Sequence, residues 1–462
     1  MNRLSSTALI LVLSVGLMVS RAPAQPATNQ PDAAPPADSR PIVLRAARLF
    51  DSVSGRLTRP GVVVVTGRRI EAVGTDARIP ANAEVIDLGD ATLLPGFMDA
   101  HVHLSMEMSD NWYKDFYNDI MRFPAEKALY GSSYARRTLE AGFTTVRDLG
   151  GGDYVPLGLR NAINAGAIEG PRMLVANYAI GATAGHADQA PYPPQLIKPA
   201  GPIQGVCNSP DECRAAVRYQ IKYGADVIKF MPSGGVLSLS DSVDAPELTQ
   251  AEMNAIVSEA HTWGRKVAAH CHGDTAAKMA IAAGVDSIEH GTFLRDDTLR
   301  EMKKKGVYLV PTLFAGYWVG QKADEYPPAI AAKARAAAAQ MRTMFQHAAK
   351  IGVRIALGTD SGVEPHGLDA REFGLMTANG LSPAQALMAG TANAADLLGV
   401  AQETGTLQPG KYADIVALPG NPLSDIQDTE HPMFVMKEGV IYVRARSEQA
   451  DSAAQPQSRT DH

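Results

Sequence analysis

Two histidines one residue apart, His101 and His103, end a short apolar stretch of the chain. Residues 91–95 read ATLLP, and residues 96–104 continue as GFMDAHVHL. Side chains alternate between the two faces of a β-strand, so these two imidazoles point the same way. Two imidazoles on one face at the end of a buried strand can bind one metal ion. The pair alone is weak support for a metal site, so the rest of the chain must supply matching ligands.

Further residues of metal-binding type stand in or at the ends of later apolar segments. They are Lys229 in DVIKFM, His270 and His272 in KVAAHCH, His290 in SIEHG and Asp360 in GTDSG. Each has an ordinary structural explanation. The lysine can extend its amine to solvent, a single histidine can be a packed core residue, and the aspartate can cap a helix. Independent structural roles do not gather such groups at five strand ends, so the set predicts a metal site.

The elements that must position these residues alternate between strands and helices. Eight strands are predicted, at residues 93–104, 144–149, 172–179, 226–231, 266–272, 287–290, 308–312 and 354–359. Helical segments lie between them, including 124–141, 211–223, 249–263, 274–283, 296–305 and 328–350. This order predicts an α/β fold, a (β/α)8 TIM barrel, in which chemistry takes place at the carboxyl ends of the strands.

Short strands separated by turn residues flank this region on both sides. They are predicted at 42–44, 61–65, 70–73, 84–88, 413–418 and 434–443. The pattern predicts one small β-sandwich domain formed from both chain ends. The predicted boundaries are a signal peptide at 1–24, a disordered N-terminus at 25–40, the sandwich at 41–92 and 399–446, the barrel at 93–398, and a disordered tail at 447–462.

The first 25 residues have the order of a secretory signal. Arg3 is positively charged, residues 8–19 are apolar but too few to span a bilayer, and Ala22-Pro23-Ala24 forms a small-x-small cleavage site. The segment has no cysteine, which argues against a lipid anchor. An uncleaved membrane anchor is the alternative. We expect an exported protein, periplasmic or secreted, with no membrane association after cleavage.

The overall composition is that of a soluble globular protein. The chain has 462 residues, of which 45% are hydrophobic and 20% charged, and its net charge is −6. This charge gives no reason to expect nucleic acid or an anionic membrane as a partner.

Three cysteines are present. Cys207 and Cys213 lie six residues apart in a polar loop, and export would permit a disulfide between them. Two free thiols are the alternative. Cys271 stands between two histidines and should point away from their face, so we interpret it as a packing residue.

The chain resembles the metal-dependent amidohydrolase superfamily. The resemblance runs from about residue 41 to 443 and rests on the order of the histidines, lysine and aspartate described above. Four segments resemble a subgroup of imidazolonepropionase-like proteins, Xaa-Pro dipeptidases and ochratoxin A amidases: 181–188 (GATAGHAD), 228–235 (IKFMPSGG), 287–291 (SIEHG) and 405–414 (GTLQPGKYAD). The resemblance implies a hydrolase of carbon–nitrogen bonds with two divalent metal ions, usually zinc. It also implies a homo-oligomer.

The same resemblance implies which residue binds which metal ion. Lys229 would carry a CO2-derived carbamate that bridges the two ions. A lysine ammonium beside two dications should lose its proton, and the neutral amine can then take up CO2. His101, His103 and Asp360 would bind the more buried ion, and His270 and His290 the outer one. Strand alternation cannot choose between His270 and His272, and the spacing in the family favours His270. His272 would then contact substrate or support a ligand.

The expected reaction is attack of a metal-bridging hydroxide on an amide carbonyl. Asp360 would accept the proton of the water and return it to the leaving nitrogen. The resemblance places His186 in a glycine-rich loop facing the substrate, where it would stabilise the oxyanion or bind a carboxylate. A solvated loop histidine is the ordinary alternative. Ser233 and Gly234 belong to a loop whose backbone could approach the substrate.

The predicted substrate is a small molecule, a dipeptide or N-acyl amino acid with a free C-terminal carboxylate. An Xaa-Pro-type dipeptide and an ochratoxin A-type amide both fit this description. The alternatives are a cyclic-amide hydrolase of the imidazolonepropionase type and, less favoured, a non-catalytic metal-binding protein.

Overall fold

The computed structural model describes residues 40–444, except residues 110, 189–192, 194, 196 and 240. The predicted signal peptide, residues 25–39 and the predicted disordered tail lie outside the described residues. Within the described part of the chain, no helix has the length and apolar content that crossing a bilayer requires.

Eight parallel strands form the centre of the larger α/β region. They form two sheets with the orders β10-β9-β8 and β11-β12-β13-β14-β15. Their bounds are β8 (Phe97–Val102), β9 (Phe143–Asp148), β10 (Arg172–Val175), β11 (Val227–Phe230), β12 (Lys266–Cys271), β13 (Ser287–His290), β14 (Tyr308–Val310) and β15 (Arg354–Ile355). All eight predicted strands are therefore present, most of them shorter than predicted. The first, predicted at 93–104, is divided: residues 93–95 belong to β7 (Ala91–Pro95), a strand of a different sheet, and only Phe97–Val102 form the parallel strand β8. The last is reduced to two residues.

Parallel bridges connect the two sheets at both edges. Ile180, just after β10, pairs with Phe230 of β11, and Val102 of β8 pairs with Ser361, which follows β15. The Ala100 N–H also donates to the Leu357 carbonyl at 2.9 Å. The residues that follow β15 therefore lie beside β8, although they are no longer a regular strand.

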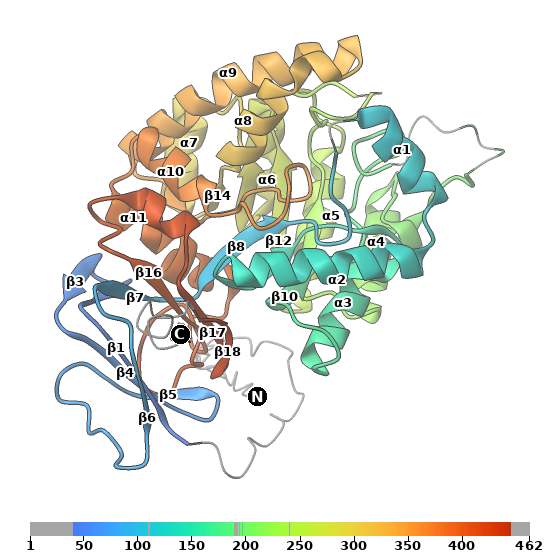
Figure 1. Ribbon diagram of the computed structural model, residues 1–462. Helices are drawn as coiled ribbons and strands as arrows, with labels where there is room; N and C mark the ends of the chain where they lie inside the picture. Colours follow the sequence, from blue (N-terminus) through green and yellow to red (C-terminus); the bar gives the residue numbers. More distant parts are fainter. Residues whose placement is uncertain are drawn as a thin grey trace, which may run out of the picture.

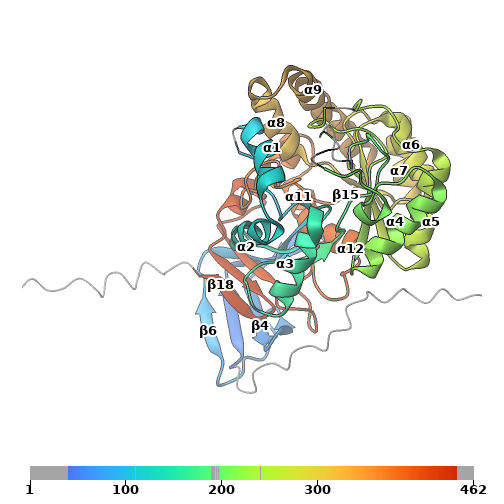
Figure 2. The ribbon, with the colours of Figure 1, turned by 90° about the vertical axis from the view of Figure 1, so that its right-hand side faces the viewer.

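Helices cover the outside of these strands (Figures 1 and 2). Their bounds are α1 (Trp112–Met121), α2 (Pro124–Glu140), α3 (Val155–Asn164), α4 (Pro210–Lys222), α5 (Gln250–Thr262), α6 (Asp274–Ala283), α7 (Asp296–Lys305), α8 (Leu313–Gln321), α9 (Pro328–Ile351), α10 (Arg371–Ala378), α11 (Pro383–Met388) and α12 (Ala394–Leu398). Capping residues in the local sequence determine where several of these helices begin. Thr249 and Glu252, for example, form a capping box at the start of α5. Helices α1 and α8, which line the cavity described below, are not among the helices predicted from the sequence.

Strands from the two ends of the chain share one sheet, seen as blue and red arrows in Figure 1. This sheet has the order β18-β17-β16-β7-β2-β3, and a second sheet has the order β5-β4-β1-β6. The strands are β1 (Ile42–Ala46), β2 (Arg48–Asp51), β3 (Arg56–Thr58), β4 (Gly61–Thr66), β5 (Arg69–Val73), β6 (Glu84–Asp87), β7 (Ala91–Pro95), β16 (Ile415–Pro419), β17 (Phe434–Lys437) and β18 (Val440–Arg444). One apolar core with residues from both sheets, including Leu44, Val63, Ile415 and Phe434, lies between them.

The predicted run 434–443 is two strands rather than one. Glu438 and Gly439 separate β17 from β18, with φ values of 51° and 80°. Two consecutive residues with positive φ form the tight turn that suits a hairpin. A charged residue followed by glycine was the available signal.

Candidate active site

Asp360 and the two histidines at the end of β8 form one group at the carboxyl ends of the parallel strands. His101 lies in β8 and His103 follows that strand. Asp360 Oδ1 lies 3.1 Å from His103 Nε2 and 3.3 Å from His101 Nε2. The Asp360 N–H donates to the His101 carbonyl at 2.8 Å, which fixes the two segments side by side. Three atoms that commonly bind divalent metals thus lie together.

Three further histidines, His270, His272 and His290, form a second group. His290 Nε2 lies 3.0 Å from His270 Nδ1, and the ring of His272 stacks on that of His290 with a centroid distance of 4.9 Å. One nitrogen from each of the three lies within 4.8 Å of the other two. The same distance holds for His101, His290 and Asp360, so His290 belongs to both groups. The structure therefore brings His270 and His272 to the site together.

Lys229 reaches the same place from β11. Its Nζ lies 3.2 Å from His101 Nε2, and the side chain is 1% exposed. Burial lowers the pKa of Lys229 to about 8, although Glu289 and Asp360 act in the opposite direction. A buried lysine of this kind holds a neutral amine in a large fraction of molecules at mildly alkaline pH.

The backbone leaves the strand conformation where three of these segments end. His290, Thr312 and Asp360 have φ values of 68°, 50° and 70°. The left-handed conformation costs a non-glycine residue about 1–2 kcal/mol, and such strain concentrates at functional sites. Strict strand alternation stops at these positions, and the side chains of His290 and Asp360 meet those of β8.

Hydrogen-bond acceptors orient the first pair of histidines. Glu289 Oε2 lies 3.0 Å from His101 Nδ1, and the Gly150 carbonyl lies 2.8 Å from His103 Nδ1. A carbonyl only accepts, so His103 carries a proton on Nδ1. Burial opposes ionisation of Glu289, but Arg147 and His101 hold its pKa at about 2, so it also accepts. Both histidines therefore direct Nε2 toward Asp360.

Hydroxyl groups contact the histidines of the second group. The Thr312 Oγ1 lies 2.7 Å from His290 Nδ1, and the Thr292 Oγ1 lies 2.7 Å from His272 Nδ1. His270 Nε2 is buried and has no hydrogen-bond partner among the described residues. A buried ring nitrogen without a partner is uncommon unless it binds something else.

Burial keeps most of these imidazoles neutral. It lowers the pKa of His101 to about 4 and that of His272 to about 3, and it lowers the pKa values of His270 and His290 well below 6.5. Neutral imidazole is the form that binds metals.

The Asp360 carboxyl, in contrast, is negatively charged. Burial opposes ionisation of the Asp360 carboxyl, but neighbouring histidines hold its pKa far below the usual range. The site therefore combines an ionised carboxylate with the neutral rings of four histidines, whereas the pKa of His103 is raised, because the opposing effect of burial is outweighed by its contact with Asp360.

This donor set fits a divalent metal ion. The Nε2 atoms of His101 and His103 point at an ionised carboxylate, and that arrangement is repulsive unless a cation, either a proton or a metal ion, lies between them. The unpartnered nitrogen of His270 gives a second, independent indication.

Two further residues of the site, Glu289 and its partner Arg147, are not among those predicted from the sequence. Arg147 Nη2 lies 2.9 Å from Glu289 Oε1, and both side chains are almost fully buried. A carboxylate inside the four-residue buried strand SIEH was the signal that could have found Glu289.

His186 lies beside the histidine cluster. Its ring centroid is 4.4 Å from that of His270, and it contributes to the wall of the cavity. Ser233 and Gly234, expected to contact substrate, do not form part of that wall. Ser233 is fully buried, and its Oγ accepts the His272 N–H at 3.0 Å. A side chain on Gly234 would meet the Ser242 carbonyl at 2.3 Å, so this glycine closes the loop rather than facing the cavity.

A cavity of about 460 Å³ opens above the site. Its lower wall contains the clustered histidines, Lys229 and Asp360. Its upper wall is largely apolar and comes from α1, α8, α9 and the loop after β11. The apolar residues include Trp112, Phe116, Val236, Leu237, Ala315, Gly316, Val319, Ala334, Ala337 and Met341.

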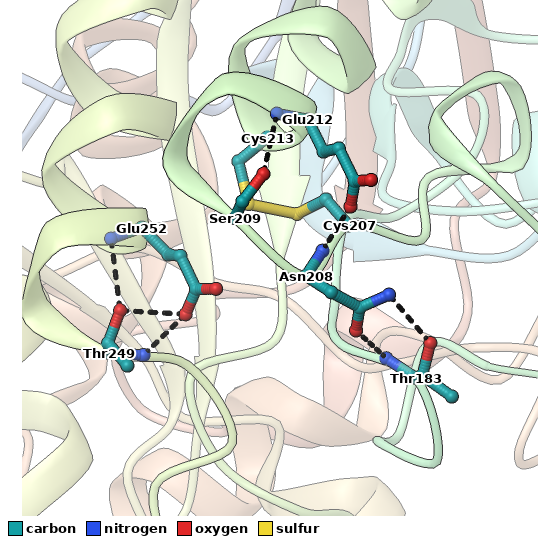
Figure 3. The surroundings of a disulfide bond; sticks show 8 residues. All are labelled: Thr183, Cys207, Asn208, Ser209, Glu212, Cys213, Thr249 and Glu252. Atoms are coloured by element: carbon teal, nitrogen blue, oxygen red, sulfur yellow. Dashed lines mark hydrogen bonds between the residues drawn. A yellow bond between two sulfur atoms is a disulfide. The ribbon is translucent and has the colours of Figure 1, made fainter.

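Cys207 and Cys213 are joined by a disulfide near the loop that carries His186 (Figure 3). The Asn208 side chain donates to Thr183 Oγ1 at 2.9 Å and accepts the Thr183 N–H at 3.1 Å. The disulfide and these bonds connect the start of α4 to the segment before His186. Cys271 is buried and free, as its predicted packing role requires.

Residues 92–442 match the family model described as "Amidohydrolase family". The chain belongs to the amidohydrolase family. This amidohydrolase is therefore a hydrolase that acts on amide bonds, and metal dependence is typical of its family.

Individual relatives agree with this assignment. The amidohydrolase is 32% identical over 419 residues to an ochratoxinase of Aspergillus niger, covering 86% of this chain and 85% of the relative. It is 25% identical to an imidazolonepropionase of Acinetobacter baumannii, covering 81% and 89%. A solved Xaa-Pro dipeptidase with bound methionine superposes with a TM-score of 0.83 and 38% identity, covering 87% of this chain and all of that one.

Proposed function

We propose that this amidohydrolase is a binuclear metal enzyme that cleaves the amide bond of dipeptides or N-acyl amino acids with a free C-terminal carboxylate. The observation that carries the proposal is the shared position of Asp360 Oδ1, 3.1 Å from His103 Nε2 and 3.3 Å from His101 Nε2. His290 connects this group to His270 and His272. Two overlapping donor groups in one buried site suit two ions rather than one.

The bound metal ions would lower the pKa of water and polarise the substrate carbonyl. His101, His103 and Asp360 would hold one ion, and His270 and His290 the other. His272 lies in the same group as His270 and His290. Glu289 fixes the ring of His101 so that Nε2 faces the site. Asp360 is ionised and can accept a proton from the attacking water and return it to the leaving nitrogen.

Lys229 is proposed to react with CO2 to form a carbamate. In this step the neutral amine attacks the carbon of CO2, a nitrogen–carbon bond forms, one carbon–oxygen π bond opens so that its electron pair moves to oxygen, and a water molecule takes the proton that the amine nitrogen loses. The lowered pKa of about 8 supplies the neutral amine that this step requires. The product is an anionic side chain with two oxygens, a suitable ligand for two dications.

The cavity supports a substrate with a bulky apolar group. Small residues of α8 and α9, such as Gly316, Ala334 and Ala337, leave the apolar space open. A Cβ on Gly316 would lie 2.4 Å from Met341 Sδ, so the glycine lets the Met341 side chain pack closely against α8. The names of the relatives, an ochratoxinase and an Xaa-Pro dipeptidase, agree with an acyl or aminoacyl group in this space.

Arg122 and Lys127 are proposed to bind the carboxylate of the substrate. Apart from Lys229, they are the cationic side chains among the described residues of the cavity wall. Lys127 Nζ lies 2.8 Å from Asp119 Oδ1, and Arg122 Nε lies 3.7 Å from Glu126 Oε1. A carboxylate could join either cation with little rearrangement.

We also propose the closure of the barrel, the β-sandwich, the export of the protein and its assembly. The bridged strands form a closed (β/α)8 barrel, the β-rich ends form a sandwich, and the chain is exported and assembles into a homo-oligomer. Bridges at both sheet edges support closure of the barrel.

A substrate panel tests the function. The zinc-loaded full chain is assayed against Xaa-Pro, Xaa-Arg and acyl-Phe amides and against cyclic amides such as imidazolone propionate. We expect turnover of the linear amides with a free carboxylate. Turnover of cyclic amides alone would favour the imidazolonepropionase-type function, to which the 25% identical relative points. Hydrolysis of no compound would favour a binding role.

A further inference from the structure

A chain of polar side chains lies behind His186 and leads away from the cavity. His186 Nδ1 lies 3.1 Å from Ser238 Oγ, and Ser238 Oγ lies 2.5 Å from Asp241 Oδ2. Asp241 Oδ1 lies 2.8 Å from Lys333 Nζ. Lys333 comes from α9 and also donates to the carbonyls of Gly235 and Ser238, at 3.1 and 3.0 Å. These contacts join the loop after β10, the loop after β11 and a helix.

The donors and acceptors among these four side chains determine where the hydrogen atoms lie. Asp241 is ionised, because hydrogen bonds from Lys333 and Ser238 outweigh the effect of burial and lower the pKa of Asp241. Ser238 Oγ also lies 3.2 Å from the Gly235 carbonyl, but the ionised carboxylate at 2.5 Å is the stronger acceptor, so the single hydroxyl hydrogen points to Asp241. Ser238 Oγ can then only accept from His186, so the hydrogen in that contact belongs to Nδ1.

The position of the ring is also fixed. A Cβ on Gly235 would lie 2.1 Å from His186 Cε1 and 2.3 Å from Nδ1, so the ring packs directly on the glycine backbone. The backbone N–H of His186 donates to Glu247 Oε2 at 2.9 Å, which holds this residue in the loop. No described residue forms a hydrogen bond with His186 Nε2, and the histidine lines the cavity.

We propose that Ser238, Asp241 and Lys333 are positioning residues that hold His186 as the Nδ1–H tautomer, with Nε2 presented to the cavity as a hydrogen-bond acceptor. Such a nitrogen recognises an N–H group of the substrate, such as the amide N–H of an acyl-Phe substrate; the peptide bond of an Xaa-Pro dipeptide has no N–H, so this contact applies to secondary amides. This consequence for substrate rests on the proposed function, whereas the tautomer does not.

The inference changes the role expected for His186 from the sequence. A neutral ring with its lone pair on Nε2 cannot donate a hydrogen bond to an oxyanion or a carboxylate. These anionic groups must then be recognised elsewhere, and Arg122 and Lys127 remain for the carboxylate.

Nitrogen NMR of the zinc-loaded full chain, labelled with 15N in the histidine rings, tests the tautomer directly. The signal of His186 is assigned as the one lost in His186→Gln. We expect wild type to show a protonated Nδ1 and an unprotonated Nε2 at this residue. Ser238→Ala should convert the signal to a mixture or to the Nε2–H form, and Ser238→Thr should restore the wild-type pattern. Ser242→Ala is the matched control, because Ser242 lies in the same loop and bonds Asp244 instead.

Kinetics test the consequence for substrate. For an acyl-Phe amide, Ser238→Ala should lower kcat/KM about tenfold, whereas the change should be less than about twofold for the N-methylated amide, which has no N–H. A proton on Nε2 in wild type, or an unchanged Nδ1–H pattern in Ser238→Ala, would overturn the tautomer. Equal losses for both substrates would overturn the N–H recognition. If no amide is hydrolysed, the proposed function fails while the NMR result still decides the tautomer.

Discussion

Glu289 Oε2 and His101 Nδ1 lie 3.0 Å apart, although the two residues are separated by 188 positions in the chain. The other oxygen, Glu289 Oε1, accepts hydrogen bonds from Arg147 at 2.9 Å and from Ser287 Oγ at 2.5 Å, so the two oxygens serve different partners. The pair therefore determines both the orientation and the tautomer of a histidine that faces the candidate metal site.

Replacing Glu289 with Gln should weaken metal binding about 10- to 100-fold. Gln has one acceptor oxygen where Glu has two, so Arg147 and His101 can no longer both be satisfied. The measurement is the zinc retained by the full chain after dialysis against graded chelator concentrations. Glu301→Gln, on the partly exposed face of α7, is the control, since Glu301 pairs with the surface lysines Lys304 and Lys305. Equal zinc affinity in the two variants would contradict the orienting role.

Asp360→Asn should reduce kcat by about 10²- to 10⁴-fold, because the amide cannot accept the proton of the attacking water. Zinc content should fall less than activity, since the histidines remain in place. Parallel measurement of kcat and bound zinc separates the two effects. An Asp360→Asn protein with near wild-type activity would remove Asp360 from the proposed mechanism.

Ala337→Phe should fill the apolar part of the cavity between α8 and α9. We expect kcat/KM for acyl-Phe amides with an aromatic acyl group to fall by about 10- to 100-fold, and that for an acetyl amide to change much less. Ala336→Phe is the control, because residue 336 is exposed on the same helix. If both substrates lose activity equally in Ala337→Phe, the acyl group does not occupy this space.

Glu247→Gln should change how stability depends on pH. Burial and nearby Asp241 raise the pKa of Glu247 to about 7, so the folded protein binds this proton more tightly than the unfolded chain. The contribution is full below the unfolded pKa near 4.5 and is lost as pH rises through about 7. Chemical denaturation at pH 5 and pH 8 should show wild type losing stability relative to Glu247→Gln over this interval. A constant difference between the two proteins would contradict the raised pKa.

Removing the disulfide with Cys207→Ser and Cys213→Ser should lower the free energy of unfolding by about 2 kcal/mol, the value expected for a loop this short. The bridged cysteines are six residues apart. Denaturation of wild type with a reductant should reproduce the loss, while the serine variant should be insensitive to it. A reductant effect of equal size in both proteins would place the sensitivity elsewhere.

The sequence was most informative where chemistry and periodicity coincide. Alternating apolar segments located all eight parallel strands, and the strand-end histidines, Lys229 and Asp360 lie together in the structure. His272 could not be separated from His270 by alternation, and the structure places both in one group.

Other features depend on contacts that no local pattern records. His290 and Asp360 reach the site through positive φ angles at the ends of their segments, whereas strand alternation assumes regular backbone. Glu289 acts on a histidine 188 residues away, so its role appears only when β8 and β13 are brought together. Ser233 belongs to a loop with the small residues typical of substrate-binding loops, but its side chain is buried and accepts a hydrogen bond from the His272 N–H.

Zinc titration of the metal-free full chain in bicarbonate buffer tests the central claim most directly. Hydrolysis of an acyl-Phe amide is followed as zinc is added in equivalents per chain. The proposed function predicts no turnover without metal, and a rise in activity that levels off at about two equivalents. Turnover that persists in the metal-free protein, or activity complete at one equivalent, would contradict a binuclear amidohydrolase.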